Sequence, residues 1–536
     1  MIAADTRQWM HADAFSWLCA GTVLASLVFG GGTHIGFLAD AALQLASIPL
    51  FLVAIWLWCD SPQAGKARLV LVFCAAVAAL PLLQLIPLPA WFWSHLPGRT
   101  LATETYALLA KPLPWMPISL TPQATWIAAL SVIPPLAIFL GTSLLPNAHR
   151  RTLSLCVIGF GIVSVFMGLI QVAQGPASPL RLYEFTNPTE AVGFFANRNH
   201  FAALLYCITL LSVAWLIDAS AGDEAATPRR RTRFDAGRVA MLILGFTIVV
   251  VLIAAQAMAR SRAGIGLTIA GLFAALLLAL SDRRNISGLT PAKMLTGTVV
   301  VAMLFAVQFA LYRIMERSAF DPLSDTRVLI AHNTIKAALA HMPFGSGLGS
   351  FVEVYDQFEP SQDAMLNAYA NHAHNDVLEF WLETGVLGIV MAALFLFWLV
   401  INAVKIWRRR PAGQIQIDLL LARAATVVIA LLLAHSVVDY PLRTGAMMAI
   451  MAFACALLVE APVVPEVQPA TASTGQSARS VFARPRAPVI QGPLINPSVG
   501  SSNALGNKPG PATGAGEKWV DDIEWPAEWR SPSDKK

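Results

Sequence analysis

The sequence predicts an all-α, polytopic membrane protein with about 12 transmembrane helices, each long enough to cross the bilayer. Of its 536 residues, 56% are hydrophobic and only 13% are charged, and the mean hydropathy is +0.61. This composition is typical of membrane proteins and excludes an ordinary soluble domain. Apolar stretches long enough to cross about 30 Å of hydrocarbon recur along the chain as far as Glu460.

The predicted spans are joined by short connections, with two long exceptions near residues 89–123 and about 313–376. The second, of roughly sixty residues, falls between the ninth and tenth spans, and loops of such length are usually functional. The first span lacks a cleavage site and is therefore expected to be a retained anchor. The spans are residues 13–31, 37–59, 67–88, 124–145, 153–173, 197–218, 237–256, 263–281, 293–312, 377–404, 417–437 and 442–460.

Lysine and arginine cluster in every second loop, which predicts that those loops and both termini are cytoplasmic. The intervening loops, including 174–196, 257–262 and 438–441, then face outward. The net charge of +5 is therefore a topology signal, and no basic surface interleaved with aromatic residues indicates a nucleic-acid partner. The clusters are Lys66 with Arg68, Arg150 with Arg151, residues 228–234, residues 282–284 with Lys293, and residues 405–410.

The chain divides at residue 460 into two regions of different composition. Residues 1–460 form the predicted transmembrane domain. Residues 461–536 are rich in Pro, Ala, Gly and Ser, which cannot bury enough apolar surface to offset the entropy lost on ordering. We expect this region to be a disordered cytoplasmic tail.

Three polar clusters fall at the predicted outer surface. Each alone has a plain explanation, because arginines at span ends often extend to lipid headgroups and asparagines often cap helices. Three clusters on one face instead indicate a functional site. They are GFFANRNHFA at 193–202, with Arg198 and Asn199; ARSRAG at 259–264, with Arg260 and Arg262; and YANHAHNDVLEFWLETGVLG at 369–388.

The third cluster predicts a helix that begins at residue 375 or 376, because Asp376 followed by Glu379 resembles a capping box. His374 precedes that N-terminus, where the helix dipole favours a neutral imidazole that can act as a general base. Asp376, Glu379 and Glu383 share one helix stripe, with Glu383 roughly 10 Å along the axis. Buried carboxylates need partners, and we expect the arginines of the other outer clusters to supply them.

Four further features of the sequence near this cluster carry structural expectations. Gly385 and Gly388 predict close helix packing. Two motifs, HNTIK at 332–336 and GSGLG at 345–349, lack the context of catalytic or phosphate-binding sequences and are interpreted as loop structure. His435 and Asp439 offer another outer polar group, but a pair between Asp439 and Arg443 is the plainer interpretation.

In combination these motifs resemble the O-antigen ligase superfamily, which includes lipopolysaccharide O-antigen ligases and related O-antigen or exopolysaccharide polymerases. The resemblance covers roughly residues 190–445. HSVVDYPLR at 435–443 also resembles a segment of members associated with polysaccharide export. The matching positions are His374, Asn375, Leu378, Glu383, Gly385 and Gly388; Ser261, Arg262, Ala263 and Gly264; NRNHFA at 197–202; and Arg327 with PFGSGLG at 343–349.

The resemblance implies a GT-C-like glycosyltransferase that works without metal or cofactor on the periplasmic face of the bacterial inner membrane. Its donor would be a glycan on polyprenyl (undecaprenyl) diphosphate. It implies catalytic roles for His374, Arg198 and Arg262, and its spacing favours His374 over His372 as the base. Weaker substrate-binding or orienting roles fall to Arg260, Arg327, Asn199, Asn375, Glu379 and Glu383.

Two classes of function follow from this combination. We favour a polymerase of lipid-linked repeat units over a ligase that transfers finished glycan to another acceptor. The partners would be the lipid-linked donor, a glycan or lipid acceptor, the bilayer, and a chain-length regulator or export machinery. The alternative is a non-catalytic flippase or secondary transporter, but such proteins usually show related halves and charges near mid-membrane, and no internal repeat is evident.

Overall fold

The computed structural model describes residues 2–34, 38–60, 64–221, 236–281, 322–361, 369–409 and 417–462. Within these ranges the regular elements are helical, apart from an isolated bridge between Leu88 and Met116. The predicted span at 293–312 lies outside the described residues, and so does the predicted tail from residue 463 onward.

The predicted multi-span, all-helical class is confirmed for the described part of the chain. Eight helical segments there are long and apolar enough to cross a membrane, and each overlaps a predicted span. They are α2 (Leu38–Cys59), α6 with α7 (Pro122–Ser131 and Ile133–Leu144), α8 (Asn147–Gln174), α9 (Arg198–Ala221), α10 (Ala236–Ala259), α11 (Arg262–Ser281), α15 (Asp376–Arg408) and α16 (Ile417–His435). Three further helices with shorter apolar segments are α1 (Ile2–Phe29), α3 (Ala64–Gln84) and α17 (Gly445–Leu458).

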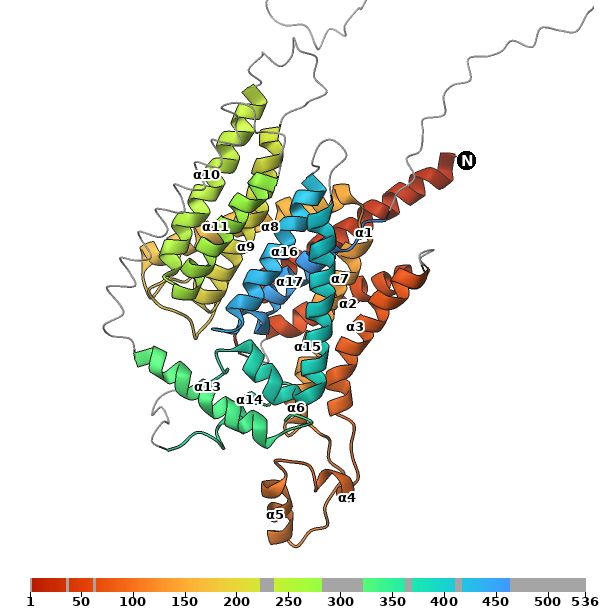
Figure 1. Ribbon diagram of the computed structural model, residues 1–536, viewed down its shortest axis with the longest axis vertical. Helices are drawn as coiled ribbons and strands as arrows, with labels where there is room; N and C mark the ends of the chain where they lie inside the picture. Colours follow the sequence, from red (N-terminus) through yellow and green to blue (C-terminus); the bar gives the residue numbers. More distant parts are fainter. Residues whose placement is uncertain are drawn as a thin grey trace, which may run out of the picture. The chain divides into compact units, whose positions relative to one another are not determined.

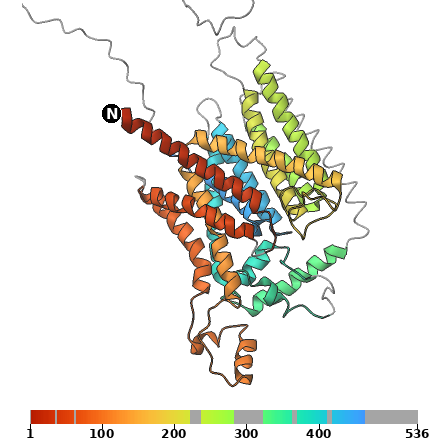
Figure 2. The ribbon, with the colours of Figure 1, turned by 180° about the vertical axis from the view of Figure 1, so that it is seen from behind.

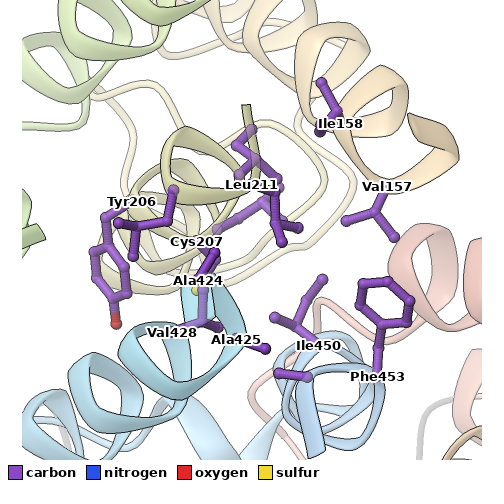
Figure 3. Packing of buried hydrophobic residues seen from close by; sticks show 14 of the residues in the cluster. Val157, Ile158, Tyr206, Cys207, Leu211, Ala424, Ala425, Val428, Ile450 and Phe453 are labelled. Carbon is purple, nitrogen blue, oxygen red and sulfur yellow. The ribbon is translucent and has the colours of Figure 1, made fainter. Parts of the chain in front are cut away.

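Helix α9 lies at the centre of the largest hydrophobic core. Its most apolar window is 94% buried, as expected for a helix that is hydrophobic on every side. It packs against α8, α10, α11 and α16, while α17 packs on α16 and α7 (Figure 1). Figure 3 shows side chains from α8, α9, α16 and α17 meeting in this core, among them Leu211, Val428 and Phe453. From behind, α1 lies along α2 and α17 (Figure 2).

The long segment before α15 is folded where it is described. It contains α13 (Pro322–Ala340) and α14 (Phe351–Tyr355), which both pack against α15 (Figure 1). The expectation of loop structure at 332–336 is therefore wrong, because Ile330 and Ala337, seven residues apart, bury one face of α13 in a small core with Leu382. Residues 345–349 do form a loop, as predicted. The connection between α3 and α6 carries α4 (Ala90–Trp93) and α5 (Thr100–Leu108).

Helix α15 is interrupted at Gly385, whose φ of 60° and ψ of −145° are not helical. The loop at 343–345 enters this gap, and the Val386 N–H donates to the Pro343 carbonyl at 2.9 Å. A Cβ on Gly385 would lie 2.2 Å from that carbonyl oxygen. The predicted close packing at Gly385 is therefore present, but its neighbour is a loop and not a second membrane helix. The first turns of α15 are held in place by this contact.

Candidate functional site

Asn375 starts α15 by capping it. Its side-chain oxygen accepts hydrogen bonds from the backbone N–H groups of Val377 and Leu378, at 3.0 and 3.1 Å. The first helical residue is Asp376, which confirms the predicted helix start. The capping group differs from the prediction, since the residue before Asp376 does the capping.

Asp376 is free for another role, because it is not the cap. One of its carboxylate oxygens accepts from the Ser436 hydroxyl at 2.7 Å and from the Leu442 N–H at 3.2 Å. Both donors come from the turn between α16 and α17. The start of α15 is thereby fixed to residues that lie 60 or more positions away in sequence.

The carboxylate stripe on α15 surrounds one guanidinium group. Nη1 of Arg443 lies 2.7 Å from Oε2 of Glu383 and 3.5 Å from Oε1 of Glu379, and its Nε lies 3.6 Å from Oδ1 of Asp376. Arg443 belongs to the 3-10 turn η2 (Pro441–Arg443). The prediction that the arginines of the outer clusters would neutralise the stripe is thus wrong, and so is the predicted pair between Arg443 and Asp439.

Arg443 is charged in this setting for a clear physical reason. Burial alone would lower its pKa, but Glu379, Glu383 and Asp376 outweigh burial and hold the pKa of Arg443 above its usual value. Because the three carboxylates share this guanidinium, each member of the group depends on the others. In the described part of the chain, Nη2 of Arg443 is buried without a hydrogen-bond partner.

His372 uses both ring nitrogens within the protein. Its Nδ1 lies 2.8 Å from Oε1 of Glu379, and its Nε2 lies 3.2 Å from the Thr33 carbonyl oxygen. Both neighbours are acceptors, so both nitrogens must donate, which requires the imidazolium form. Burial alone would lower the pKa of His372, but the charge and hydrogen bond of Glu379 raise it above its ordinary value. A ring in this state has no lone pair to accept a proton.

His374 has a different environment although it is only two residues away. Its Nδ1 lies 3.1 Å from Oδ1 of Asp439, and its side chain is 24% exposed. The buried Asp439 also accepts from the side-chain amide of Asn199 and from the Tyr440 N–H. If Nδ1 donates to the carboxylate, Nε2 keeps its lone pair. The geometry is therefore suited to proton acceptance at Nε2.

Asp439 is held as a carboxylate by its partners. Burial alone would raise its pKa, but the hydrogen bond from His374 and the nearby charges, including Arg327, lower the pKa of Asp439 below its usual value. A carboxylate at this position also stabilises an imidazolium when His374 accepts a proton. The sequence indicated Asp439 as part of an outer polar group with His435 or, more plainly, as a partner of Arg443, and its contact with His374 was not predicted.

Tyr440 packs between three histidine rings. Its ring centroid lies 4.4 Å from that of His372, and 5.0 Å from those of His374 and His200. The Asn197 side chain is 3.4 Å from its hydroxyl. Tyr440 therefore fixes the spacing of the two histidines before α15 and joins them to the start of α9. Nothing in the spacing of the sequence indicated this role.

Arg198 is the first residue of α9 and is paired with an acidic residue from the preceding loop. Its Nη1 lies 2.5 Å from Oε1 of Glu190, and its side chain is 23% exposed. The next residue, Asn199, is the amide that donates to Asp439. Arg198 is thus adjacent in sequence to Asn199, which contacts Asp439, the partner of His374. Glu190 was not selected from the sequence.

Arg260 lies in the tight turn between α10 and α11, Arg262 is the first residue of α11, and both are exposed. Arg260 has a φ of 50°, and the Ser261 hydroxyl accepts from the Gly264 N–H at 3.0 Å. A Cβ on Gly264 would lie 2.5 Å from the Cβ of Ala202 in α9. Serine thus closes the turn and glycine permits α11 to approach α9, which places both arginines near the start of α9.

Glu190 links Arg260 to Arg198 electrostatically. Burial alone would raise the pKa of Glu190, but a hydrogen bond from Thr189 and the charges of Arg198 and Arg260 together lower it. Arg327 belongs to α13, and its Nη1 donates to the carbonyl of Val438, in the turn after α16, at 3.4 Å. Three of the predicted arginines therefore lie near this group of residues through described interactions.

Comparison with known proteins gives one family. A protein-family model described as O-Antigen ligase matches residues 246–393, from within α10 into α15. No sequence among the curated proteins matches the chain. The matched range contains Arg260, Arg262, Arg327 and His374, whereas Arg198, Asp439 and Arg443 lie outside it.

Proposed function

We propose, from the premise that this chain belongs to the O-antigen ligase superfamily, that it transfers a glycan from a polyprenyl (undecaprenyl) diphosphate donor to an acceptor. Members of this family are glycosyltransferase-like membrane enzymes, and lipid-linked glycans are their general substrates. The observation that carries the proposal is the pair between His374 and Asp439, which leaves one imidazole nitrogen available as a base.

The proposed reaction begins with the acceptor hydroxyl. Nε2 of His374 takes its proton as the oxygen forms a bond to the anomeric carbon of the donor glycan. The bond between that carbon and the diphosphate oxygen breaks, and its electron pair leaves with the diphosphate. Asp439 holds the Nδ1–H tautomer and stabilises the resulting imidazolium. The attack proceeds with inversion at the anomeric carbon.

Arginines suit the diphosphate leaving group. A guanidinium fork binds phosphate oxygens through two hydrogen bonds and remains charged, so it stabilises the negative charge that develops as the bond breaks. We assign this role to Arg198 and Arg262, with Arg260 and Arg327 as additional contacts. This positive charge lets the reaction run without a metal or cofactor.

The remaining predicted residues orient the base. Asn375 caps α15 and also donates to the Val437 carbonyl at 2.8 Å. Glu379 accepts from the Ala373 N–H at 2.8 Å, which fixes the segment that carries His374. Glu383 is the closest partner of Arg443. Asn199 positions Asp439 from the start of α9.

We place the site on the periplasmic face of the inner membrane, with both termini in the cytoplasm. Support comes from the distribution of lysine and arginine, because the described site residues lie at span ends and loops whose alternation predicts an outward position. We favour chain polymerisation over ligation on the basis of the 435–443 segment. A chain-length regulator or export machinery would then be a partner.

Transfer by the purified protein tests this function. The protein in nanodiscs is incubated with lipid-diphosphate-linked glycan from its host, with and without a candidate lipid acceptor, and the products are resolved by mass. Longer lipid-linked chains identify a polymerase, and glycan on the second acceptor identifies a ligase. If a donor verified in crude membranes gives neither product with folded protein, while the same protein in sealed proteoliposomes moves lipid-linked glycan across the bilayer, the chain is a transporter and the proposal is wrong.

A further inference from the structure

A cavity of about 540 Å³ lies beside His372. Its described lining comes from four segments that meet at the end of the bundle that carries the candidate site. These segments are the chain after α1, the first turn of α6, the start of α14 and the residues just before α15. The lining residues used below are Thr33, Gln123, Glu353, Tyr369, Asn371 and His372.

The lining has the chemistry of a site for hydroxyl groups. Gln123 and Asn371 each offer an amide that both donates and accepts, and the Glu353 carboxylate accepts from one or two hydroxyls. Tyr369 is 55% exposed and presents an aromatic face on which the C–H groups of a sugar ring can pack. A cavity with few, convergent polar groups and an aromatic wall is a common form of small-molecule site.

The charge of the lining argues against a diphosphate in this cavity. Among its described residues there is no lysine or arginine, and Glu353 would repel phosphate oxygens. The charge of His372 is already balanced by Glu379. The arginine-bearing helices α9, α10, α11 and α13 contribute none of the described lining residues. The diphosphate and the contents of the cavity therefore have separate places.

The cavity is connected to the base through Tyr440. His372 on its wall and His374 pack on the same Tyr440 ring. Displacement with inversion requires the acceptor oxygen and the leaving diphosphate to lie on opposite faces of the anomeric carbon. The cavity reaches the base through His372, two residues before His374, whereas Arg198 reaches it through Asn199 and Asp439, so the acceptor and the diphosphate would approach from different segments.

We propose that this cavity is the subsite for an uncharged, hydroxyl-rich segment of the acceptor glycan. Gln123, Glu353 and Asn371 bind its hydroxyl groups, and Tyr369 packs against a ring. This inference rests on the proposed function, because it names the kind of acceptor that the transferase would take. It predicts selection of neutral over anionic acceptor sugars.

Binding can be measured without transfer. The probe is host glycan released from its lipid by mild acid, and saturation-transfer NMR follows its contact with protein in nanodiscs. Gln123→Trp should fill the cavity and remove the signal. Glu353→Gln should weaken binding roughly tenfold through loss of a charged hydrogen bond. Asp356→Asn removes an exposed carboxylate from the end of α14 outside the cavity and should bind as wild type does.

The outcomes distinguish a failure of glycan binding in the cavity from a failure of glycan transfer. Size-exclusion profiles and melting temperatures first show that each variant is folded. Binding by the wild type that is lost in Gln123→Trp and retained in Arg262→Ala supports the cavity, even if transfer itself is not detected. Equal binding by the wild type and both cavity variants overturns the inference. If the wild type transfers glycan, an acceptor KM in Glu353→Gln that equals the wild-type KM also overturns it. Absence of glycan binding to folded wild type also overturns it.

Discussion

Nδ1 of His374 lies 3.1 Å from Oδ1 of Asp439, although 65 residues separate the two in sequence. The chain returns to this point after crossing α15 and α16. His372, only two residues away, is instead bound on both nitrogens by acceptors. Two histidines in one short segment therefore face different groups: His372 meets an acceptor at each nitrogen, whereas His374 meets the Asp439 carboxylate at Nδ1.

Replacement of Asp439 by asparagine should impair the base. An amide can donate to Nδ1, which favours the tautomer whose Nε2 carries a proton and cannot accept one. We expect the turnover number for glycan transfer to fall by roughly 10²–10⁴-fold, the usual contribution of acid–base catalysis, with little change in donor KM.

The matched control for this change is Asp418→Asn. Asp418 pairs with Arg151 through two contacts of 2.6 Å, at the opposite end of α16 from His435. Its replacement should leave transfer within about twofold of wild type, because exposed and partly exposed pairs contribute little. An unchanged turnover number in folded Asp439→Asn would exclude Asp439 from the catalytic group.

Arg443 should be required for stability more than for a contact with substrate. Arg443→Met removes the guanidinium that Asp376, Glu379 and Glu383 share and leaves only the His372 imidazolium beside Glu379, and breaking such a buried group typically costs about 3–5 kcal/mol. The measurement is the melting temperature in nanodiscs. The double variant with Glu383→Gln should recover part of the loss, since it removes one of the uncompensated charges.

The control for Arg443 is Arg409→Met, which removes an exposed pair with Glu460. We expect a change of less than about 1 kcal/mol in that variant. If Arg443→Met melts at the wild-type temperature, the three carboxylates are not balanced by this arginine in the folded protein.

His372 predicts a pH dependence of stability. Its pKa in the folded protein is raised above the ordinary value of about 6.5, because Glu379 stabilises the imidazolium. The imidazolium therefore contributes stability that is fully present below about pH 6.5 and is lost as pH rises through the raised pKa. The difference in melting temperature between wild type and His372→Gln should be largest at low pH and should narrow as pH rises. A difference that widens with pH would show that His372 is buried in its neutral form.

Gly385 should not tolerate a side chain. Its φ is +60°, and an alanine Cβ would meet the Pro343 carbonyl at 2.2 Å, so Gly385→Ala should cost about 1–3 kcal/mol and loosen the first turns of α15. Gly159→Ala in α8 is the control, because its added Cβ meets nothing within 4 Å. Melting temperatures compare the two. Equal stability of both variants would mean that the loop at 343–345 does not occupy the gap.

Local patterns in the sequence predicted the local parts of this fold. The apolar stretches predicted the membrane helices, and the spacing of Asp376 and Glu379 predicted the start of α15 at residue 375 or 376. The carboxylate stripe of Asp376, Glu379 and Glu383 was also predicted, because residues spaced by one and two helical turns share a face. These features depend on neighbours in the chain and need no knowledge of the tertiary structure.

Pairings across long stretches of chain could not be predicted in the same way. Asp439 and Arg443 are four residues apart and were predicted to pair, yet Asp439 faces His374 and Arg443 faces Glu383. The choice depends on how the turn between α16 and α17 meets the start of α15. The helix that contains residues 332–336 was not predicted for a related reason. Its few apolar residues become buried only because α14 and α15 pack against them.

The most direct test of the central claim compares His374→Ala with His372→Gln in one transfer assay. Both variants are purified in nanodiscs, matched to wild type for folding, and supplied with the same lipid-diphosphate-linked glycan. We predict that His374→Ala loses nearly all of the initial rate, whereas His372→Gln keeps measurable transfer because its ring does not accept the proton. Full activity in His374→Ala, together with loss in folded His372→Gln, would contradict the assignment of His374 as the base.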